Sequence, residues 1–155
     1  MHADLDHLAF LVGTWRGAGR GEYATIDPFD YSEEMTFTFH GEPWLAYEQR
    51  AWSADDGTIL HMERGFVRPA PGGGVELVLA HPIGVVEVAH GSVAGGTIEV
   101  ATTPGSVGRS HTGLDVIGLT RRYTVSGDVM GYRIDMATET TPMAVHLTAE
   151  LRRVA

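Results

Sequence analysis

The sequence contains no cysteine, and this absence removes several kinds of chemistry at once. Without thiols the chain has no disulfides, iron–sulfur clusters, thiolate metal sites or cysteine nucleophile, which fits a reducing compartment. The sequence also lacks any apolar run near the roughly 18 residues of a membrane span. The short apolar stretch 8–12 follows Asp4 and Asp6, where a signal peptide would carry positive charge. We therefore expect a cytoplasmic protein that does not enter a membrane.

Positive charge is scarce as well. Eleven Lys and Arg residues face 20 Asp and Glu residues, and the formal net charge is −9. Nucleic-acid binding depends on clustered positive charge that neutralises phosphates, so this composition argues against a nucleic-acid partner. The pairs Arg121–Arg122 and Arg152–Arg153 are interpreted as solvated strand ends.

Several catalytic motifs are missing. There is no GxSxG turn of a serine hydrolase and no HExxH zinc motif. The glycine-rich stretch 13–21 opens a predicted strand rather than a helix, so it lacks the helix N-terminus of a dinucleotide site. A zinc site would require His61, His81 and His111 to converge from separate strands, and this alternative stays open.

What the sequence does contain is a series of short alternating segments. Its length of 155 residues predicts one domain, 1–155, with a substantial core. Leu5, Leu8, Ala9 and Val12 have helical spacing before Gly13, which predicts a short N-terminal helix. Residues 24–30 are interpreted as a connection. The segments with strand character are 13–23, 31–40, 44–53, 59–68, 75–81, 84–91, 96–102, 114–125, 129–138 and 143–154.

Tight turns join these segments, as at Gly95–Gly96 and at 126–128. Strands linked in this way pair antiparallel, and about ten of them close into a barrel to remove exposed edges. We predict an all-β fold, an antiparallel up-and-down β-barrel of the calycin or fatty-acid-binding-protein type. A barrel of this size has room for a ligand.

The predicted interior mixes apolar residues with imidazoles. His81 continues the phase of Leu77 and Leu79, and His61 shares a face with Ile59 and Glu63. Each of these histidines is equally well explained as an ordinary core or rim residue. Met136 continues the phase of Tyr132 and Ile134. His146 alternates against Val145, Leu147 and Leu151, so periodicity alone predicts a surface position for it.

Four segments in order resemble the nitrobindins. Residues 13–19 fit the GxWxGxG signature of that family, and residues 25–31, 76–82 and 142–147 match it further along the chain. The resemblance covers essentially the whole sequence. It implies a ten-stranded barrel, similar to fatty-acid-binding proteins, that holds one haem b near its open mouth.

The resemblance also implies an activity and a site. The family keeps the iron ferric, binds nitric oxide and isomerises peroxynitrite to nitrate. His146, within Pro-x-x-x-His-Leu, matches the axial ligand, and it is expected to turn inward despite the alternation. The other pocket positions fall on Thr25, His61, His81 and Met136. The signature residues are expected to be architectural, with Trp15 at the closed end of the barrel; they are Gly13, Trp15, Gly17 and Gly19. The family also allows a homodimer.

One position departs from the family pattern. Close relatives have a lysine at the start of the eighth strand, where this sequence has Leu114. Such a lysine would pair with a haem propionate, so its loss is expected to weaken haem retention or to move that contact to Arg109 or His111. Two rival functions use the same architecture. One is a haem-free barrel that carries a fatty acid or another small hydrophobic molecule, and the other is a regulatory domain with a vestigial pocket.

Overall fold

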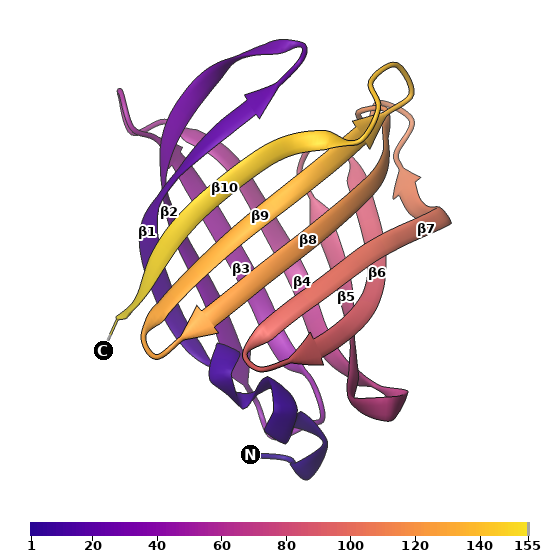
Figure 1. Cartoon of the computed structure of the whole chain (residues 1–155). Helices are drawn as coiled ribbons and strands as arrows, with labels where there is room; N and C mark the ends of the chain where they lie inside the picture. The colour runs from indigo at the N-terminus through magenta and orange to yellow at the C-terminus, as the bar shows by residue number, and fades with distance from the viewer. Residues whose placement is uncertain (155) are drawn as a thin grey trace.

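Ten antiparallel strands form the protein in a computed structural model that describes residues 1–154 (Figure 1). A 3₁₀ helix, η1 (Ala3–Leu11), precedes them, and a single 3₁₀ turn, η2 (Pro71–Gly73), joins two of them. The strands are β1 (Gly13–Tyr23), β2 (Ile26–Phe39), β3 (Leu45–Ser53), β4 (Ile59–Ala70), β5 (Gly74–His81), β6 (Val85–Ala94), β7 (Thr97–Arg109), β8 (Val116–Ser126), β9 (Val129–Thr138) and β10 (Ala144–Val154).

Each strand pairs with its neighbour in sequence, and β1 also pairs with β10, so the sheet closes on itself. The closing seam aligns Thr14 with Val154 and Gly21 with Leu147. Closure pairs every strand on both sides over at least part of its length, which is the physical advantage of a barrel over an open ten-stranded sheet. The outer part of β7, beyond Ala101, pairs with β6 alone. The predicted up-and-down meander is confirmed.

Two predicted boundaries were wrong. Residues 26–30 belong to β2, so the connection between β1 and β2 is only the turn Ala24–Thr25. Strand β7 runs to Arg109, seven residues beyond its predicted end. In both places the extra residues are mostly exposed, so they lack the apolar alternation by which a strand is recognised.

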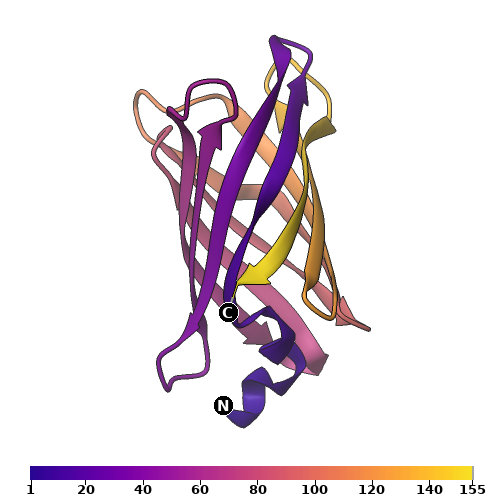
Figure 2. The ribbon, with the colours of Figure 1, turned by 90° about the vertical axis from the view of Figure 1, so that its left-hand side faces the viewer.

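The N-terminal helix closes one end of the barrel (Figure 2). Leu5, Leu8 and Leu11 are buried at a spacing of three, which places them on one face of a helix with three residues per turn. The Trp15 indole N–H donates to the Leu11 carbonyl over 2.8 Å. The expected position of Trp15 at the closed end is therefore what the structure has.

Arg153 fastens this end from the last strand. Its guanidinium lies 4.0 Å from the centroid of the Trp15 ring and donates to the Phe10 carbonyl over 3.0 Å and to the Val12 carbonyl. The interpretation of Arg153 as a solvated strand end was wrong, because its guanidinium packs on Trp15 and binds the chain at the end of η1. The last carbonyls of a helix have no partner within the helix, so they are free to accept from it.

The glycines of β1 allow close packing of neighbouring groups. A Cβ atom on Gly17 would lie 2.0 Å from the Glu150 carbonyl oxygen, and one on Gly19 would lie 2.3 Å from Cζ of Tyr31. Gly13 has φ of +128°, which side chains rarely adopt, at the point where the chain leaves the helix. These contacts explain the spacing of the glycines without a ligand.

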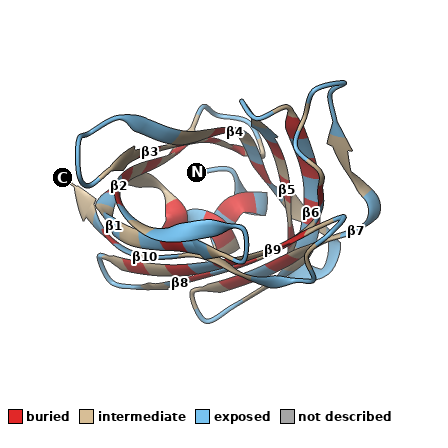
Figure 3. Ribbon diagram, turned by 90° about the horizontal axis from the view of Figure 1, so that it is seen from above, coloured by how far each residue is buried: buried red, intermediate tan, exposed pale blue. Residues whose placement is uncertain are grey.

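The inward faces of the strands form the core, seen from above in Figure 3. Apolar residues fill the half of the barrel next to the helix, whereas buried polar side chains lie further along; they are Glu33, Gln49, Glu63, Glu87 and Arg121. Within residues 1–154, no helix is long and apolar enough to cross a membrane.

Candidate functional site

A cavity of about 400 Å³ occupies the end of the barrel opposite the helix. All six residues predicted for the cofactor pocket line it: Thr25, His61, His81, Leu114, Met136 and His146. They come from the β1–β2 turn, from β4, β5, β9 and β10, and from the connection before β8. The structure therefore brings together residues that are up to 121 positions apart in the sequence, Thr25 and His146.

The cavity mouth is rimmed by exposed aliphatic side chains. Ile26, Leu60, Ile83 and Leu114 line the cavity, yet each keeps more than a third of its surface in contact with solvent. Grouped exposed hydrophobic side chains at a cavity are typical of a ligand-binding site. A flat apolar ligand seated in the mouth would remove this surface from water.

A β-bulge turns His146 toward the cavity. In the pairing of β10 with β9, Val145 lies opposite Asp135 and Leu147 opposite Ile134, so His146 is an extra residue in the ladder. A bulge breaks the strict alternation of a strand and re-aims the side chains around it. Both His146 and Leu147 consequently line the cavity, which two successive residues of a regular strand would not do.

The local contacts of His146 define its tautomer. Its Nδ1–H donates to the Glu22 carbonyl oxygen over 3.2 Å, so Nε2 carries the free lone pair. The Tyr23 ring packs edge-on against the imidazole, with centroids 5.5 Å apart. Burial lowers the pKa of His146, which favours the neutral imidazole. A neutral, oriented imidazole with a free nitrogen is the form of histidine that binds a metal.

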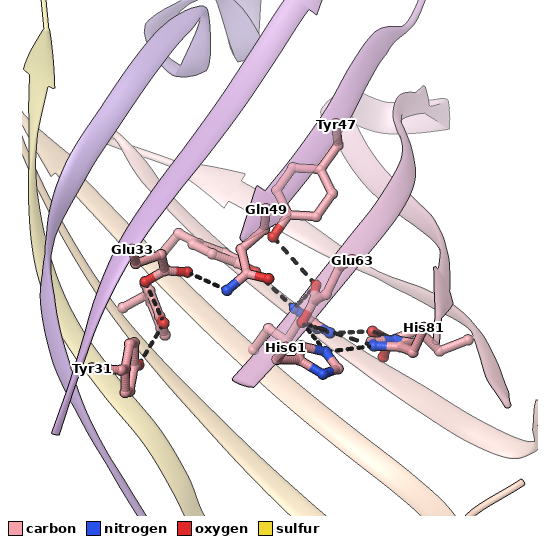
Figure 4. Close-up of polar contacts among 11 residues, drawn as sticks. Tyr31, Glu33, Tyr47, Gln49, His61, Glu63 and His81 are labelled. Atoms are coloured by element: carbon pink, nitrogen blue, oxygen red, sulfur yellow. Dashed lines mark hydrogen bonds and ion pairs between the residues drawn. The ribbon is translucent and has the colours of Figure 1, made fainter. Parts of the chain in front are cut away.

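His61 and His81 lie together on a polar part of the cavity lining, which we call the polar wall; it consists of His61, Glu63 and His81. His61 Nε2 is 3.1 Å from His81 Nδ1, and both residues have Glu63 beside them (Figure 4). The expected inward face of His81 is what the structure has. Ile59 was wrongly placed on the face of His61, because a bulge between the two leaves Ile59 exposed.

The structure does not form the cluster of His61, His81 and His111 that the sequence left open as a zinc site. His111 is exposed in the connection between β7 and β8, and it does not line the cavity. Glu63 takes the third position beside His61 and His81 instead. Residues 61 and 63 belong to one strand and point the same way because a strand has a period of two.

Behind this wall lies a buried ionic cluster. Arg121 donates through Nη1 to Oε2 of Glu63 over 2.9 Å and through Nη2 to Glu87. The Tyr47 hydroxyl donates to the same Glu63 oxygen over 3.2 Å. Burial by itself would raise the pKa of Glu63, but the Arg121 guanidinium outweighs it and holds this pKa well below its usual range. Glu63 is therefore an ionised carboxylate in the interior.

The interpretation of Arg121 as a solvated residue was wrong. Only 2% of its surface is exposed, whereas Arg122 faces water and pairs with Glu99. The signal that could have found it is the alternation of Leu119, Arg121 and Tyr123, all buried on one face of β8. Glu87 shows the same pattern between Val85 and Ala89. Charge obscured the pattern, because a buried Arg or Glu is rare unless it is paired.

A second polar group surrounds Glu33. Its carboxylate accepts from the Tyr132 hydroxyl over 2.7 Å and from the Gln49 amide over 2.9 Å, and Tyr132 also meets the Tyr31 hydroxyl at 2.6 Å (Figure 4). Burial raises the pKa of Glu33 to about 7. The carboxyl group therefore changes charge close to neutral pH.

This raised pKa predicts a pH-dependent stability. Glu33 loses its proton near its ordinary pKa of 4.5 in the unfolded chain but only near 7 in the folded chain, so the free energy of unfolding falls as pH rises between these values. The full difference is about 3 kcal/mol. In Glu33→Gln this part of the pH dependence is absent, because an amide does not ionise in this range, while it can still accept from the Gln49 amide. Urea denaturation at pH 5 and pH 8 measures it, and an equal loss of stability in both proteins would contradict the assignment.

Leu114 and its surroundings leave the mouth without a cation. Leu114 is 54% exposed at the rim, and the sequence contains no lysine at all. Arg109 forms an ion pair with Glu139 over 2.9 Å, and neither Arg109 nor His111 lines the cavity. Among the described lining residues Arg121 alone is cationic, and it is held by the two glutamates.

Comparison with known proteins gives matches over nearly the whole chain. A family model described as "THAP4-like, heme-binding beta-barrel domain" matches residues 4–153. The chain is 45% identical to "Peroxynitrite isomerase 2" of Mycobacterium ulcerans, covering 99% of this chain and 96% of that protein. It is 43% identical to "Peroxynitrite isomerase" of Nocardia farcinica, covering 99% and 92%. The crystal structure of Rv2717c from M. tuberculosis has a TM-score of 0.92 at 40% identity and covers 100% of this chain and 99% of that one.

Proposed function

Since the chain belongs to the family of THAP4-like, heme-binding β-barrel domains, we propose that its cavity binds one haem b with His146 as the axial ligand of the iron. The observation that carries this proposal is the state of His146. A β-bulge brings it to the cavity wall, and the hydrogen bond from Nδ1 to Glu22 leaves Nε2 free to bind a metal.

The cavity suits such a group in size and character. Its volume of about 400 Å³ lies within the range of cofactor sites, about 300–1,000 Å³. Met136 and Leu147 supply apolar wall beside His146, and Leu60, Ile83 and Leu114 supply an apolar rim. Haem binding requires an apolar concave pocket and one neutral imidazole, and this cavity has both.

We further propose that the protein isomerises peroxynitrite to nitrate, in keeping with the names of its relatives. We also propose that it binds nitric oxide at the same site. When bound, a ferric haem supplies an iron with an open coordination position for these small molecules. The chain's own part is to hold His146 neutral and oriented through Glu22, and to keep water from the apolar walls. A homodimer and a cytoplasmic location stay predictions.

The polar wall weakens the rival function of a fatty-acid carrier. A free Arg or Lys would bind the carboxylate of such a ligand through strong charge-assisted hydrogen bonds. Arg121 is buried against Glu63 and Glu87, so its charge is already balanced by two carboxylates. A fatty-acid headgroup near this wall would meet negative charge instead.

The experiment that tests the proposal is hemin titration followed by a peroxynitrite assay. The purified full chain is titrated with hemin while the Soret band is recorded, and the decay of peroxynitrite is then followed with and without the loaded protein. We expect saturation at one hemin per chain, faster decay and a higher yield of nitrate. A lipid in the purified protein together with no Soret shift would support the carrier instead.

Replacing Leu114 with the lysine that close relatives have at this position is expected to improve haem retention. In Leu114→Lys the ammonium can stay in water at the rim and attract a propionate, because this position is already half exposed. An exposed ion pair contributes about 1 kcal/mol or less, so haem loss should slow by up to about 5-fold. The rate of haem transfer to apomyoglobin measures this loss. Leu114→Met, which adds no charge, is the matched control, and equal rates for the two variants would contradict the role given to the charge.

A further inference from the structure

Three side chains on the polar wall form a second possible ligand set in the same cavity, distinct from His146; two of them, His61 and His81, were predicted only as lining of the haem pocket. His61 and Glu63 lie on β4 and His81 on β5, and one ligand atom from each lies within 4.8 Å of the others. The pairing of these strands places Arg64 opposite Ala80, so Glu63 and His81 are neighbours across the ladder. All three side chains line the cavity, and Figure 4 shows them pointing toward one another.

The spacing of the three ligand atoms fits a metal ion. His61 Nε2 lies 3.1 Å from His81 Nδ1 and 3.6 Å from Glu63 Oε1, and the latter two atoms are 4.0 Å apart. A point in the plane of these three atoms lies about 2.1 Å from each of them. Zinc makes bonds of about 2.0–2.2 Å to nitrogen and oxygen, so the three distances suit a shared ion.

The groups around the three ligands prepare them for a cation. His81 Nε2–H donates to Oε1 of Glu87 over 3.2 Å, so its Nδ1 carries a lone pair directed at His61. A carboxylate behind a histidine ligand is the usual second layer of a metal site. Arg121 donates to both oxygens of Glu63, through Nη1 to Oε2 over 2.9 Å and through Nη2 to Oε1 over 3.2 Å, and Tyr47 donates to Oε2. These contacts fix the carboxylate in the orientation that brings Oε1 near both histidines. An ion would replace the hydrogen that joins the two rings, with His61 then protonated on Nδ1.

The charge of the cluster favours the same occupant. Glu63 and Glu87 are almost completely buried, and Arg121 is the one cation that faces both of them within the described residues. Two buried carboxylates therefore share one guanidinium, and a divalent cation beside Glu63 would add positive charge in this low-dielectric interior, where a buried charge needs a partner. Oε2 of Glu87 is also buried and has no hydrogen-bond partner among residues 1–154.

We propose that His61, Glu63 and His81 bind a divalent first-row transition-metal ion, such as Zn²⁺ or Fe²⁺, in the wall of the cavity. Two histidines and one carboxylate are the ligand set of catalytic zinc sites and of non-haem iron sites, both of which keep further positions open. Here the open positions face the cavity. The ligand set does not include His146, so metal binding to the chain without hemin can be tested independently of the proposed haem function.

Cobalt titration of the full chain without added hemin tests this proposal. Co²⁺ reports its own coordination through its visible absorption bands, and competition with Zn²⁺ then gives the zinc affinity. We expect one Co²⁺ per chain, with bands of four- or five-coordinate cobalt that Zn²⁺ abolishes. His61→Ala should lower the affinity by at least about 100-fold, and Glu87→Gln by about 10–100-fold through the orientation of His81.

A matched variant and a check of the fold keep the outcome clear. His90→Ala removes an exposed histidine on the outside of β6 and should bind Co²⁺ as the unchanged protein does. His61 is partly exposed, so its replacement carries the smallest risk to the fold, and circular dichroism checks this. Absence of Co²⁺ bands, or equal Co²⁺ affinity in His61→Ala, would overturn the metal site whatever the result of hemin titration.

Discussion

His146→Ala should bind hemin at least about 100-fold more weakly than the unchanged protein, and its Soret band should lose the signature of histidine ligation. The apolar cavity stays in place, so some non-specific hemin binding is expected to remain. The loss is expected because the variant lacks the free Nε2 of an imidazole that the Glu22 carbonyl orients. The other two histidines that line the cavity, His61 and His81, are hydrogen-bonded to side chains instead. Hemin titration by absorbance measures the effect.

Two controls separate ligation from damage to the fold. His90→Ala, on the outer face of β6, should bind hemin normally. Imidazole added to His146→Ala should restore the Soret band, because the small molecule fills the space of the missing ring and supplies the same nitrogen. Hemin binding in His146→Ala that equals that of His90→Ala would contradict the assignment of the axial ligand.

Arg121→Met should lower the free energy of unfolding by about 3–5 kcal/mol, the usual cost of breaking a buried ion pair by removing one partner. Methionine fills much of the volume of the arginine stem but leaves Glu63 and Glu87 buried without their cation. Both carboxylates then face the interior with Tyr47, His61 and His81 as their neighbouring polar groups. Urea denaturation of the chain without added hemin measures the change.

The neighbouring arginine provides a matched comparison. Arg122→Met removes an exposed side chain paired with Glu99, and its effect should stay within about 0.5 kcal/mol. Adding Glu63→Gln and Glu87→Gln to Arg121→Met should recover much of the lost stability, because the unpaired charges are then gone. If Arg121→Met and Arg122→Met are equally stable, the buried cluster does not contribute as described.

The barrel itself could be predicted from local patterns. Ten alternating segments and turn residues such as Gly95–Gly96 determine a meander, and a meander of this length closes to protect its edges. The strand ends at 26–30 and 103–109 could not be found in this way. They extend beyond the core, where no apolar face marks them.

The site could be predicted only in part, and His146 shows why. Alternation along β10 gave it a surface position, while the resemblance to a family placed it in the pocket. The structure agrees with the second because one extra residue enters the ladder at this point. A bulge depends on how two strands pair, so the sequence of one strand does not reveal it.

The buried charges illustrate a different limit. Glu63, Glu87 and Arg121 all lie in phase with the core of their own strands, but each would be costly to bury by itself. Their burial becomes reasonable only when β4, β6 and β8 face one another across the barrel. Such mutual compensation is a property of the closed fold rather than of any single segment.

The proposed function depends most on where a haem iron would be held. Crystals of the full chain grown with one equivalent of hemin allow the iron to be located by anomalous diffraction at its absorption edge. We expect a single strong peak within bonding distance of His146 Nε2. An iron peak beside another side chain, or none in the cavity, would contradict the proposal that this barrel is a haem protein ligated by His146.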